Sequence, residues 1–181
     1  TEEFLIGGMN AILSNLQGML ESVRLGSVRT QGGFESAKIR FFDLRAESAV
    51  SPSNMGVGFS QMMPLVASAF GSKNRLIVIE QPELHVHPAL QMELADLFIE
   101  SVAARNNRFL IETHSEHLIL RVMRRIRETS EGKLPEGKPP ITTDDVCVLY
   151  VEPGENGSIV REMPLNERGE LVKGWPGGFF E

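Results

Sequence analysis

Two short apolar runs that each end in polar residues constrain the fold more than any other feature of this 181-residue sequence. The first, residues 76–79, continues into Glu80-Gln81-Pro82-Glu83, and the second, residues 109–111, continues into Glu112-Thr113-His114. Such runs are typical of buried parallel strands. A helical pattern lies between them, and a strand–helix–strand crossover brings both strand ends to one sheet edge. We therefore expect Glu80, Gln81, Glu83 and His114 along that edge.

The remaining pattern predicts an α/β fold with a largely parallel sheet that is flanked by helices and covered on both faces. Ser115 is a suitable N-cap for the last of the predicted helices. Helices are predicted over residues 9–23, 62–70, 88–102 and 116–127, and strands over residues 38–42, 75–80 and 108–113. Residues 47–54 and 131–140 are predicted loops. Two further strands, 145–151 and 158–161, and a possible third, 170–172, follow them.

We expect two domains, the α/β part over residues 1–143 and a small β-rich appendage over residues 144–181. The appendage ends in an aromatic segment, 175–180, which we expect to pack as an anchor on the domain.

Composition limits the classes of function. The formal net charge is −6, so the chain lacks the excess of basic residues that is typical of a protein that binds nucleic acid mainly through phosphates. Four arginines in one predicted helix are a weak hint of DNA binding, although a solvated helix face is the preferred interpretation. They are Arg121, Arg124, Arg125 and Arg127. The single cysteine, Cys147, lies in an apolar run and is predicted to be buried, which fits a reducing, cytoplasmic location. No membrane span or leader is expected.

The polar strand ends match the needs of nucleotide hydrolysis, which requires a group for Mg²⁺, a group that orients the attacking water and a sensor for the γ-phosphate. Glu80 is predicted to meet magnesium through water, Gln81 and Glu83 to lie next to the attacking water, and His114 to bond a γ-phosphate oxygen. Each residue alone is more simply explained as an exposed loop charge or a helix-entry residue. Together they favour the functional interpretation.

A second motif precedes the predicted helix at residue 62. It reads Gly56-Val57-Gly58-Phe59-Ser60-Gln61. Its glycines allow close approach of the backbone to a ligand, and the helix N-terminus attracts an anion. Ser60 and Gln61 add side-chain hydrogen bonds. A glycine-rich turn is a weak signal by itself, and its weight comes from standing before the acidic strand.

These residues resemble the ATP-binding-cassette (ABC) ATPase superfamily, in particular the SMC-like, RecF-like and OLD-type ATPases. Residues 58–61 look like its signature motif, 76–80 like its Walker B strand, 82–88 like its D-loop region and His114 like its switch histidine. Residues 144–181 are similar to a small C-terminal domain of unknown function in bacterial AAA-family proteins, and residues 25–29 faintly resemble a Gly-Pro-Leu-Arg element upstream in them. The resemblance implies the C-terminal part of an ABC-type ATPase head that uses ATP and Mg²⁺.

Two departures from the family pattern bear on activity. No Gly-x-x-x-x-Gly-Lys-Ser/Thr sequence occurs, so the phosphate-binding P-loop is expected upstream of Thr1. The family usually has Asp-Glu where this chain has Glu80-Gln81, and glutamine can orient a water but cannot take its proton. Either Glu83 acts as the base, or hydrolysis is slow and the ATP state long-lived, or, least favoured, a carboxylate was engineered away.

The resemblance also implies partners. Residues Gly56, Gly58, Ser60 and Gln61 would meet ATP held by an opposing protomer, so at least a homodimer is expected. Coupling to DNA, or to a nuclease or toxin effector in anti-phage defence, is implied by the family alone. Two alternatives remain: an ATP-gated clamp that does not hydrolyse ATP, and a metal-dependent hydrolase that uses His85 and His87, with Glu83 and His114, to bind Zn²⁺ or Mn²⁺.

Overall fold

The computed structural model describes residues 27–31, 38–43, 48–50, 54 and 56–174, with side chains described for 54 and for 56–174 other than Phe59. The chain divides into two compact units, residues 1–114 and 115–181. Each unit is described by itself. The predicted domain boundary at 143/144 stays a prediction, and the predicted helix over 9–23 and the aromatic segment 175–180 lie outside the described residues.

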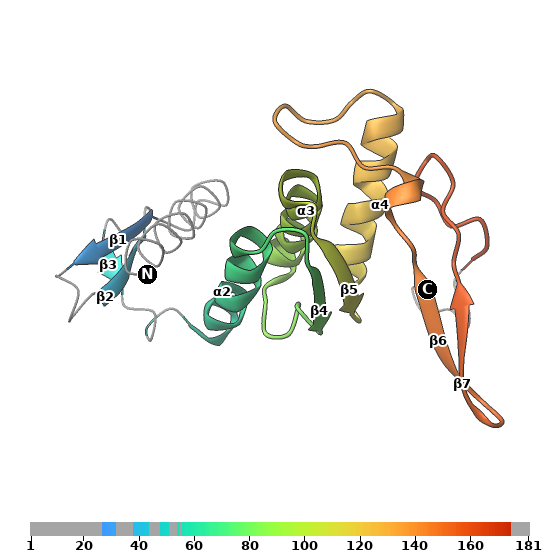
Figure 1. Ribbon diagram of the computed structural model, residues 1–181, viewed down its shortest axis with the longest axis horizontal. Helices are drawn as coiled ribbons and strands as arrows, with labels where there is room; N and C mark the ends of the chain where they lie inside the picture. Colours follow the sequence, from blue (N-terminus) through green and yellow to red (C-terminus); the bar gives the residue numbers. More distant parts are fainter. Residues whose placement is uncertain (1–26, 32–37, 44–47, 51–53, 55, 175–181) are drawn as a thin grey trace. The chain divides into compact units, whose positions relative to one another are not determined.

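The first described element of unit one is a small antiparallel sheet (Figure 1). It consists of β1 (Ser27–Gln31), β2 (Lys38–Asp43) and β3 (Ser48–Val50), in that order. Val28 pairs with Phe41, which pairs in turn with Val50. The strand predicted over residues 38–42 is confirmed. The prediction of a loop over residues 47–54 is wrong at residues 48–50, because pairing with β2 turns this short segment into a strand.

The predicted strand–helix–strand unit is confirmed. It comprises β4 (Leu76–Glu80), α3 (Pro88–Arg105) and β5 (Arg108–Glu112), and the two strands are parallel. The helix begins at Pro88, where a fixed φ suits the first turn, and ends at Asn106 in the left-handed conformation. In register, Leu76 lies opposite Arg108 and Glu80 opposite Glu112. The crossover thus places both strand ends at one edge, as the pattern requires.

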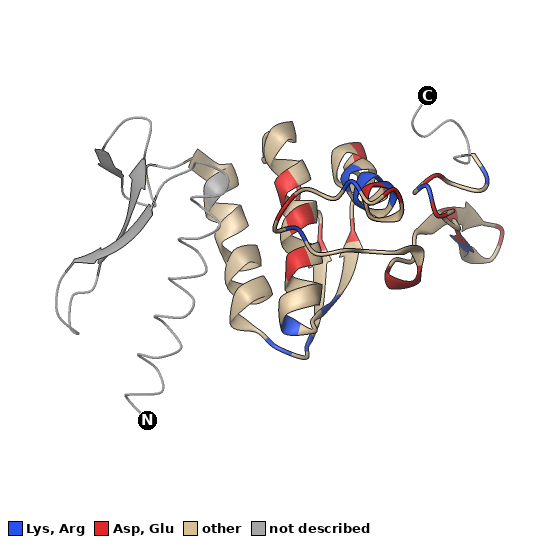
Figure 2. Ribbon diagram, turned by 90° about the horizontal axis from the view of Figure 1, so that it is seen from above, with Lys and Arg blue, Asp and Glu red and all other residues tan. Residues whose placement is uncertain are grey.

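Helices of unit one cover one face of the β4–β5 pair. Helices α2 (Gly56–Gly71) and α3 lie side by side on that face (Figure 2). Phe98 of α3 packs against Phe109 of β5, with ring centroids 4.9 Å apart and the ring planes tilted by 45°. The opposite face exposes apolar side chains of both strands: Leu76 is 65% exposed, Val78 61% and Leu110 54%. The prediction of a sheet covered on both faces stays a prediction, because α4, the next helix along the chain, belongs to unit two.

A buried polar cluster joins the end of α2 to α3 and to the start of β4. Ser101 of α3 donates a hydrogen bond to the Ala69 carbonyl at 2.6 Å, which binds the last turn of α2. Asn107, which is 1% exposed, donates to carbonyls of Ala69 and Ser72 and accepts from the Arg75 amide. These bonds satisfy carbonyls that a helix end leaves without partners.

Unit two begins with α4 (Glu116–Ser130), and its N-cap is confirmed because the Leu118 amide donates to Ser115 Oγ at 3.1 Å. After the loop over 131–140 come the short 3-10 helix η2 (Thr143–Asp145) and the hairpin of β6 (Leu149–Gly154) and β7 (Gly157–Glu162). The possible third strand is reduced to a single bridge between Leu165 and Leu171.

Cys147 is exposed, so the prediction of a buried cysteine is wrong. It precedes a two-stranded hairpin, which buries far less apolar surface than a strand inside a larger sheet.

The arginines of α4 are not a uniform solvated face. Arg124 and Arg125 both pair with Glu128, and Arg125 is buried. Arg124 and Arg125 are thus engaged within the helix, which weakens the hint of DNA binding. Burial raises the pKa of Glu128, but the hydrogen bonds from Arg124 and Arg125 outweigh it and hold the pKa below its ordinary value of 4.5.

Replacing Glu128 by glutamine should destabilise the protein by about 1 kcal/mol at pH 7, because it replaces a carboxylate that accepts from the buried Arg125 with a neutral amide. A carboxylate whose pKa is lowered by folding stabilises the fold at pH values above its unfolded pKa. This stabilisation is lost as the pH falls through the pKa of the folded state. The difference between parent and variant should therefore shrink below pH 4.5, as urea unfolding at several pH values would measure. Glu131→Gln, which removes only the exposed pair with Lys133, is the control and should change stability much less.

Candidate functional site

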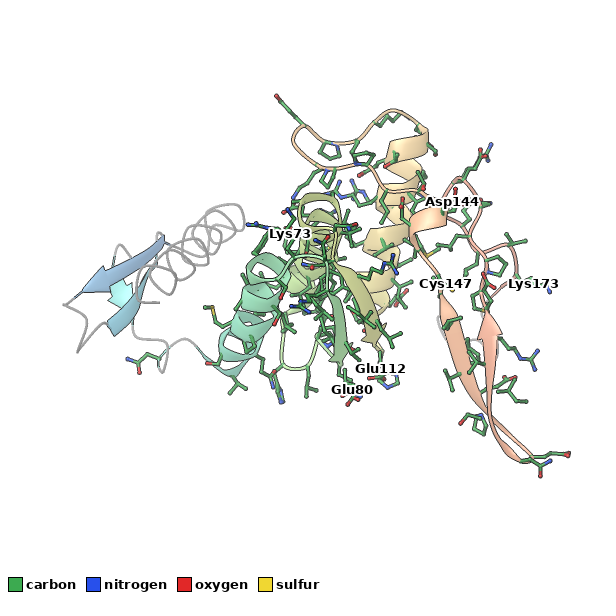
Figure 3. The ribbon with its side chains drawn as sticks, in the orientation of Figure 1. Lys73, Glu80, Glu112, Asp144, Cys147 and Lys173 are labelled. Carbon is green, nitrogen blue, oxygen red and sulfur yellow. The ribbon has the colours of Figure 1, made fainter. Side chains whose placement is uncertain are left out.

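The polar ends of β4 and β5 meet, as the sequence pattern predicts. Glu80 and Glu112 lie opposite each other in register, and Figure 3 shows both at the same end of the strand pair. Both carboxylates are exposed. His114 follows, with its Nε2 3.4 Å from Glu112 Oε1. Glu112 is a site residue that the sequence reasoning missed, although its position directly after the run 109–111 was a usable signal.

Strand β4 stops abruptly because Gln81 turns the chain away. The Gln81 amide still donates to the Glu112 carbonyl at 2.8 Å, but its φ of 48° is left-handed. The Gln81 carbonyl then accepts from the Leu84 amide at 3.1 Å, and His85 is a second left-handed residue with φ 59°. Positive φ at a residue other than glycine costs on the order of 1 kcal/mol and clusters at functional sites. Residues 81–87, hereafter the 81–87 loop, are thus a tight, strained turn.

Glu83 reaches across from the 81–87 loop to the end of β5. Its Oε1 accepts a hydrogen bond from the His114 amide at 2.7 Å. Its other oxygen, Oε2, is buried and has no hydrogen-bond partner among the described residues. The structure therefore brings Glu83 and His114 together, but through the backbone of His114 rather than its imidazole.

His87 of the 81–87 loop has a structural contact that the metal-ligand prediction did not include. His87 is the N-cap of α3, and its Nδ1 accepts from the Ala89 amide at 3.2 Å. Among the described residues, no group of three or more His, Cys, Asp or Glu side chains is arranged to hold a metal ion. The alternative of a zinc or manganese hydrolase at His85 and His87 is therefore not supported by this part of the chain.

The glycine-rich motif is not a turn before a helix but the first part of the helix itself. Helix α2 begins at Gly56, with φ 61°, six residues earlier than predicted, so Pro64 lies inside it rather than in its first turn. Proline removes the amide that would bond the Ser60 carbonyl. The Ser60 hydroxyl donates to the Gly56 carbonyl at 3.4 Å, and Ser60 and Gln61 are both exposed.

Gly58 joins this helix start to the 81–87 loop. A Cβ at Gly58 would overlap the His85 carbonyl oxygen and lie 3.2 Å from its carbonyl carbon. Only a residue without a side chain allows this approach. The glycine motif and the acidic strand end, which are separate signals in the sequence, therefore contact each other directly.

Comparison with known proteins gives a consistent result. A family model described as an AAA ATPase domain matches residues 10–119. Among curated proteins, no sequence matches this chain. Several solved structures share its fold, and two of them are described here by their similarity to this chain. One, from work on "ATP-driven dimerization and DNA stimulated activation of SMC ATPases", has a TM-score of 0.62 and 14% identity, over 90% of this chain and 89% of that one.

The other solved structure is an SmcHead bound to the C-winged helix domain of ScpA. It has a TM-score of 0.61 and 15% identity, and the match covers 87% of this chain but only 44% of that one.

Proposed function

This chain belongs to the family of AAA ATPase domains and has the fold of an SMC ATPase head, and from that premise we propose that it binds ATP with Mg²⁺ and hydrolyses it slowly. The observation that carries the proposal is the parallel pairing of β4 and β5, which sets Glu80 opposite Glu112. His114 follows two residues after Glu112 and contacts its carboxylate. Exposed acidic and imidazole groups at the carboxyl ends of parallel strands suit a metal–phosphate ligand.

Glu80 fits the role of magnesium ligand. Magnesium prefers oxygen ligands and keeps several waters, so that one or two carboxylates together with substrate phosphates are enough to hold it. The exposed Glu80 carboxylate beside Glu112 meets this need without a larger cluster of protein ligands. When bound, Mg²⁺ supplies positive charge that neutralises the phosphates.

Gln81 and His114 take the remaining roles at this edge. The Gln81 amide side chain can orient a water but cannot accept its proton, so slow turnover follows from its chemistry. The His114 imidazole is exposed at the end of β5 and can donate a hydrogen bond to a γ-phosphate oxygen. The Nε2 contact with Glu112 gives the imidazole an orientation.

The phosphate cradle is proposed to come from polypeptide outside these 181 residues, because the sequence contains no P-loop. The exposed apolar side chains of the β4–β5 pair support this proposal. Leu76, Val78 and Leu110 present an apolar surface of the kind that a further layer of an α/β fold covers.

The glycine motif is proposed to face ATP held by a second copy. Gly56, Ser60 and Gln61 are exposed at the start of α2, where amides and the helix dipole favour an anion. The likeness to a structure studied for ATP-driven dimerization supports a homodimer. Coupling to DNA is a further proposal, and the likeness to a structure studied for DNA stimulated activation supports it. Coupling to a nuclease or toxin effector, as in anti-phage defence in the cytoplasm, is proposed on the family resemblance of the sequence alone.

No helix among the described residues is both long and apolar enough to cross a bilayer.

Steady-state ATP turnover and Mg²⁺-dependent ATP binding by the full-length protein test the proposal. Glu80→Gln should lower turnover by about 100-fold, because it removes the carboxylate that meets the metal. Gln81→Glu, which supplies a proton acceptor, should raise it by about tenfold or more. The matched control is Glu155→Gln in the exposed β6–β7 turn, which makes the same chemical change and should leave turnover unaltered.

Binding without turnover in the parent and in Gln81→Glu would favour the ATP-gated clamp instead. Failure of the full-length protein to bind ATP would overturn the proposal.

A further inference from the structure

The hydrogen-bond ladder between β4 and β5 is broken at one position, and a side chain replaces the missing partner. In a parallel ladder, a residue donates its amide to one residue of the neighbouring strand and accepts at its carbonyl from the residue two further on. The Gln81 amide donates to the Glu112 carbonyl, so the Gln81 carbonyl is the ladder acceptor for the His114 amide. That carbonyl instead accepts from Leu84. Glu83 Oε1 takes its place.

We propose that Glu83 is a positioning residue that holds His114 to the 81–87 loop, and that it is not the base of the reaction. The effect of Glu83 on ATP hydrolysis rests on the proposed function, whereas the hydrogen bond between Glu83 and the His114 amide does not depend on it. A carboxylate accepting from a backbone amide forms a charge-assisted bond, about twice as strong as a neutral one. The 2.7 Å distance across 31 residues of sequence is short for an amide donor.

The surroundings of Glu83 argue against a base. A base must lie within hydrogen-bond reach of the water whose proton it takes. One oxygen of Glu83 is engaged by the His114 amide, and the other is buried. By contrast, Gln81 and Glu80 are exposed at the same strand end.

The hydrogen bond between Glu83 and the His114 amide, hereafter the tether, is linked through the 81–87 loop to helix α2, which we propose to face the second copy. Gly58 of α2 lies against the His85 carbonyl, and Glu83, in the same tight turn, holds the His114 amide. A movement of the start of α2 therefore displaces the 81–87 loop and, through Glu83, the residue that senses the γ-phosphate. This is a contiguous physical connection between two proposed functional elements.

Amide hydrogen exchange of the nucleotide-free full-length protein tests the tether directly. Glu83→Ala removes the acceptor and should raise the exchange rate of the His114 amide by about tenfold or more. Glu83→Gln keeps an acceptor oxygen and should keep most of the protection. The amide of Arg108, which donates to the Arg75 carbonyl at the start of β5, is the internal reference and should stay protected in both variants.

ATP turnover then separates positioning from base chemistry. Glu83→Ala should lower kcat by about tenfold or more, whereas Glu83→Gln should restore at least about a third of it with an unchanged pH profile, because glutamine can tether but cannot take a proton. Equal loss of kcat in both variants, with His114 protection retained in Glu83→Gln, would make Glu83 the base and overturn the proposal. Unchanged His114 exchange in Glu83→Ala would overturn the tether itself. If the parent protein showed no ATP turnover, the proposed hydrolysis would be refuted. The exchange rate of the His114 amide in Glu83→Ala would still show whether Glu83 holds that amide.

Discussion

Replacing Asn107 by alanine should lower the free energy of unfolding by about 3 kcal/mol, because a buried polar group that loses its partner costs about 1–3 kcal/mol. The Asn107 side chain is almost fully buried and serves four groups at once. Its Nδ2 lies 3.1 Å from the carbonyls of Ala69 and Ser72 and 3.0 Å from Ser101 Oγ, and its Oδ1 lies 3.1 Å from the Arg75 amide. Alanine leaves these groups in the interior without that partner. The midpoint of urea unfolding of the full-length protein would measure the loss.

The neighbouring Asn106 provides the control. It is exposed and lies in the left-handed conformation with φ 53°, which glycine adopts readily, so Asn106→Gly should change stability by less than about 0.5 kcal/mol. Asn107→Asp keeps the shape but sets a carboxylate against two carbonyls, and should be at least as destabilising as alanine. If Asn107→Asp were as stable as the parent at pH 7, the assignment of Nδ2 as the donor to Ala69 and Ser72 would be wrong.

Replacing Gly58 by alanine should destabilise the protein by about 2 kcal/mol, although the same change at an open helix position would stabilise it by about 1 kcal/mol. The added Cβ overlaps the backbone of His85, and a backbone carbonyl cannot move aside as a side chain would. The start of α2 and the 81–87 loop must separate. Because that loop carries Glu83, we also expect faster exchange of the His114 amide, which the same hydrogen-exchange experiment would measure.

Gly56→Ala is the matched control two residues away. A Cβ there meets nothing within 4 Å, so only the strain of a left-handed φ remains, about 1 kcal/mol. Its effect on His114 exchange should be small. Equal stability and equal exchange in Gly58→Ala and the parent would show that α2 does not press on the 81–87 loop.

The pattern of apolar and polar residues was sufficient to predict the parallel strand–helix–strand unit and the gathering of Glu80, Gln81 and His114 at one edge. These depend on local periodicity and on the single hand that a crossover allows. The N-cap of α4, Ser115, followed from neighbouring residues in the same way.

Features that depend on contacts between distant residues could not be predicted. The start of α2 at Gly56 rests on a helix that accommodates an interior Pro64, and β3 exists only because β2 pairs with it. The exposure of Cys147 reflects how little the hairpin beside it buries.

Residue order was enough to predict which polar groups stand at the ends of the two strands, because strand direction and the crossover leave them only one edge to occupy. The contacts that those groups make there depend on the folded path of the chain. The left-handed Gln81 gives its carbonyl to the Leu84 amide, and Glu83 Oε1 accepts from the His114 amide instead. Such an outcome depends on the exact path of a strained turn, which residue types and their spacing do not encode.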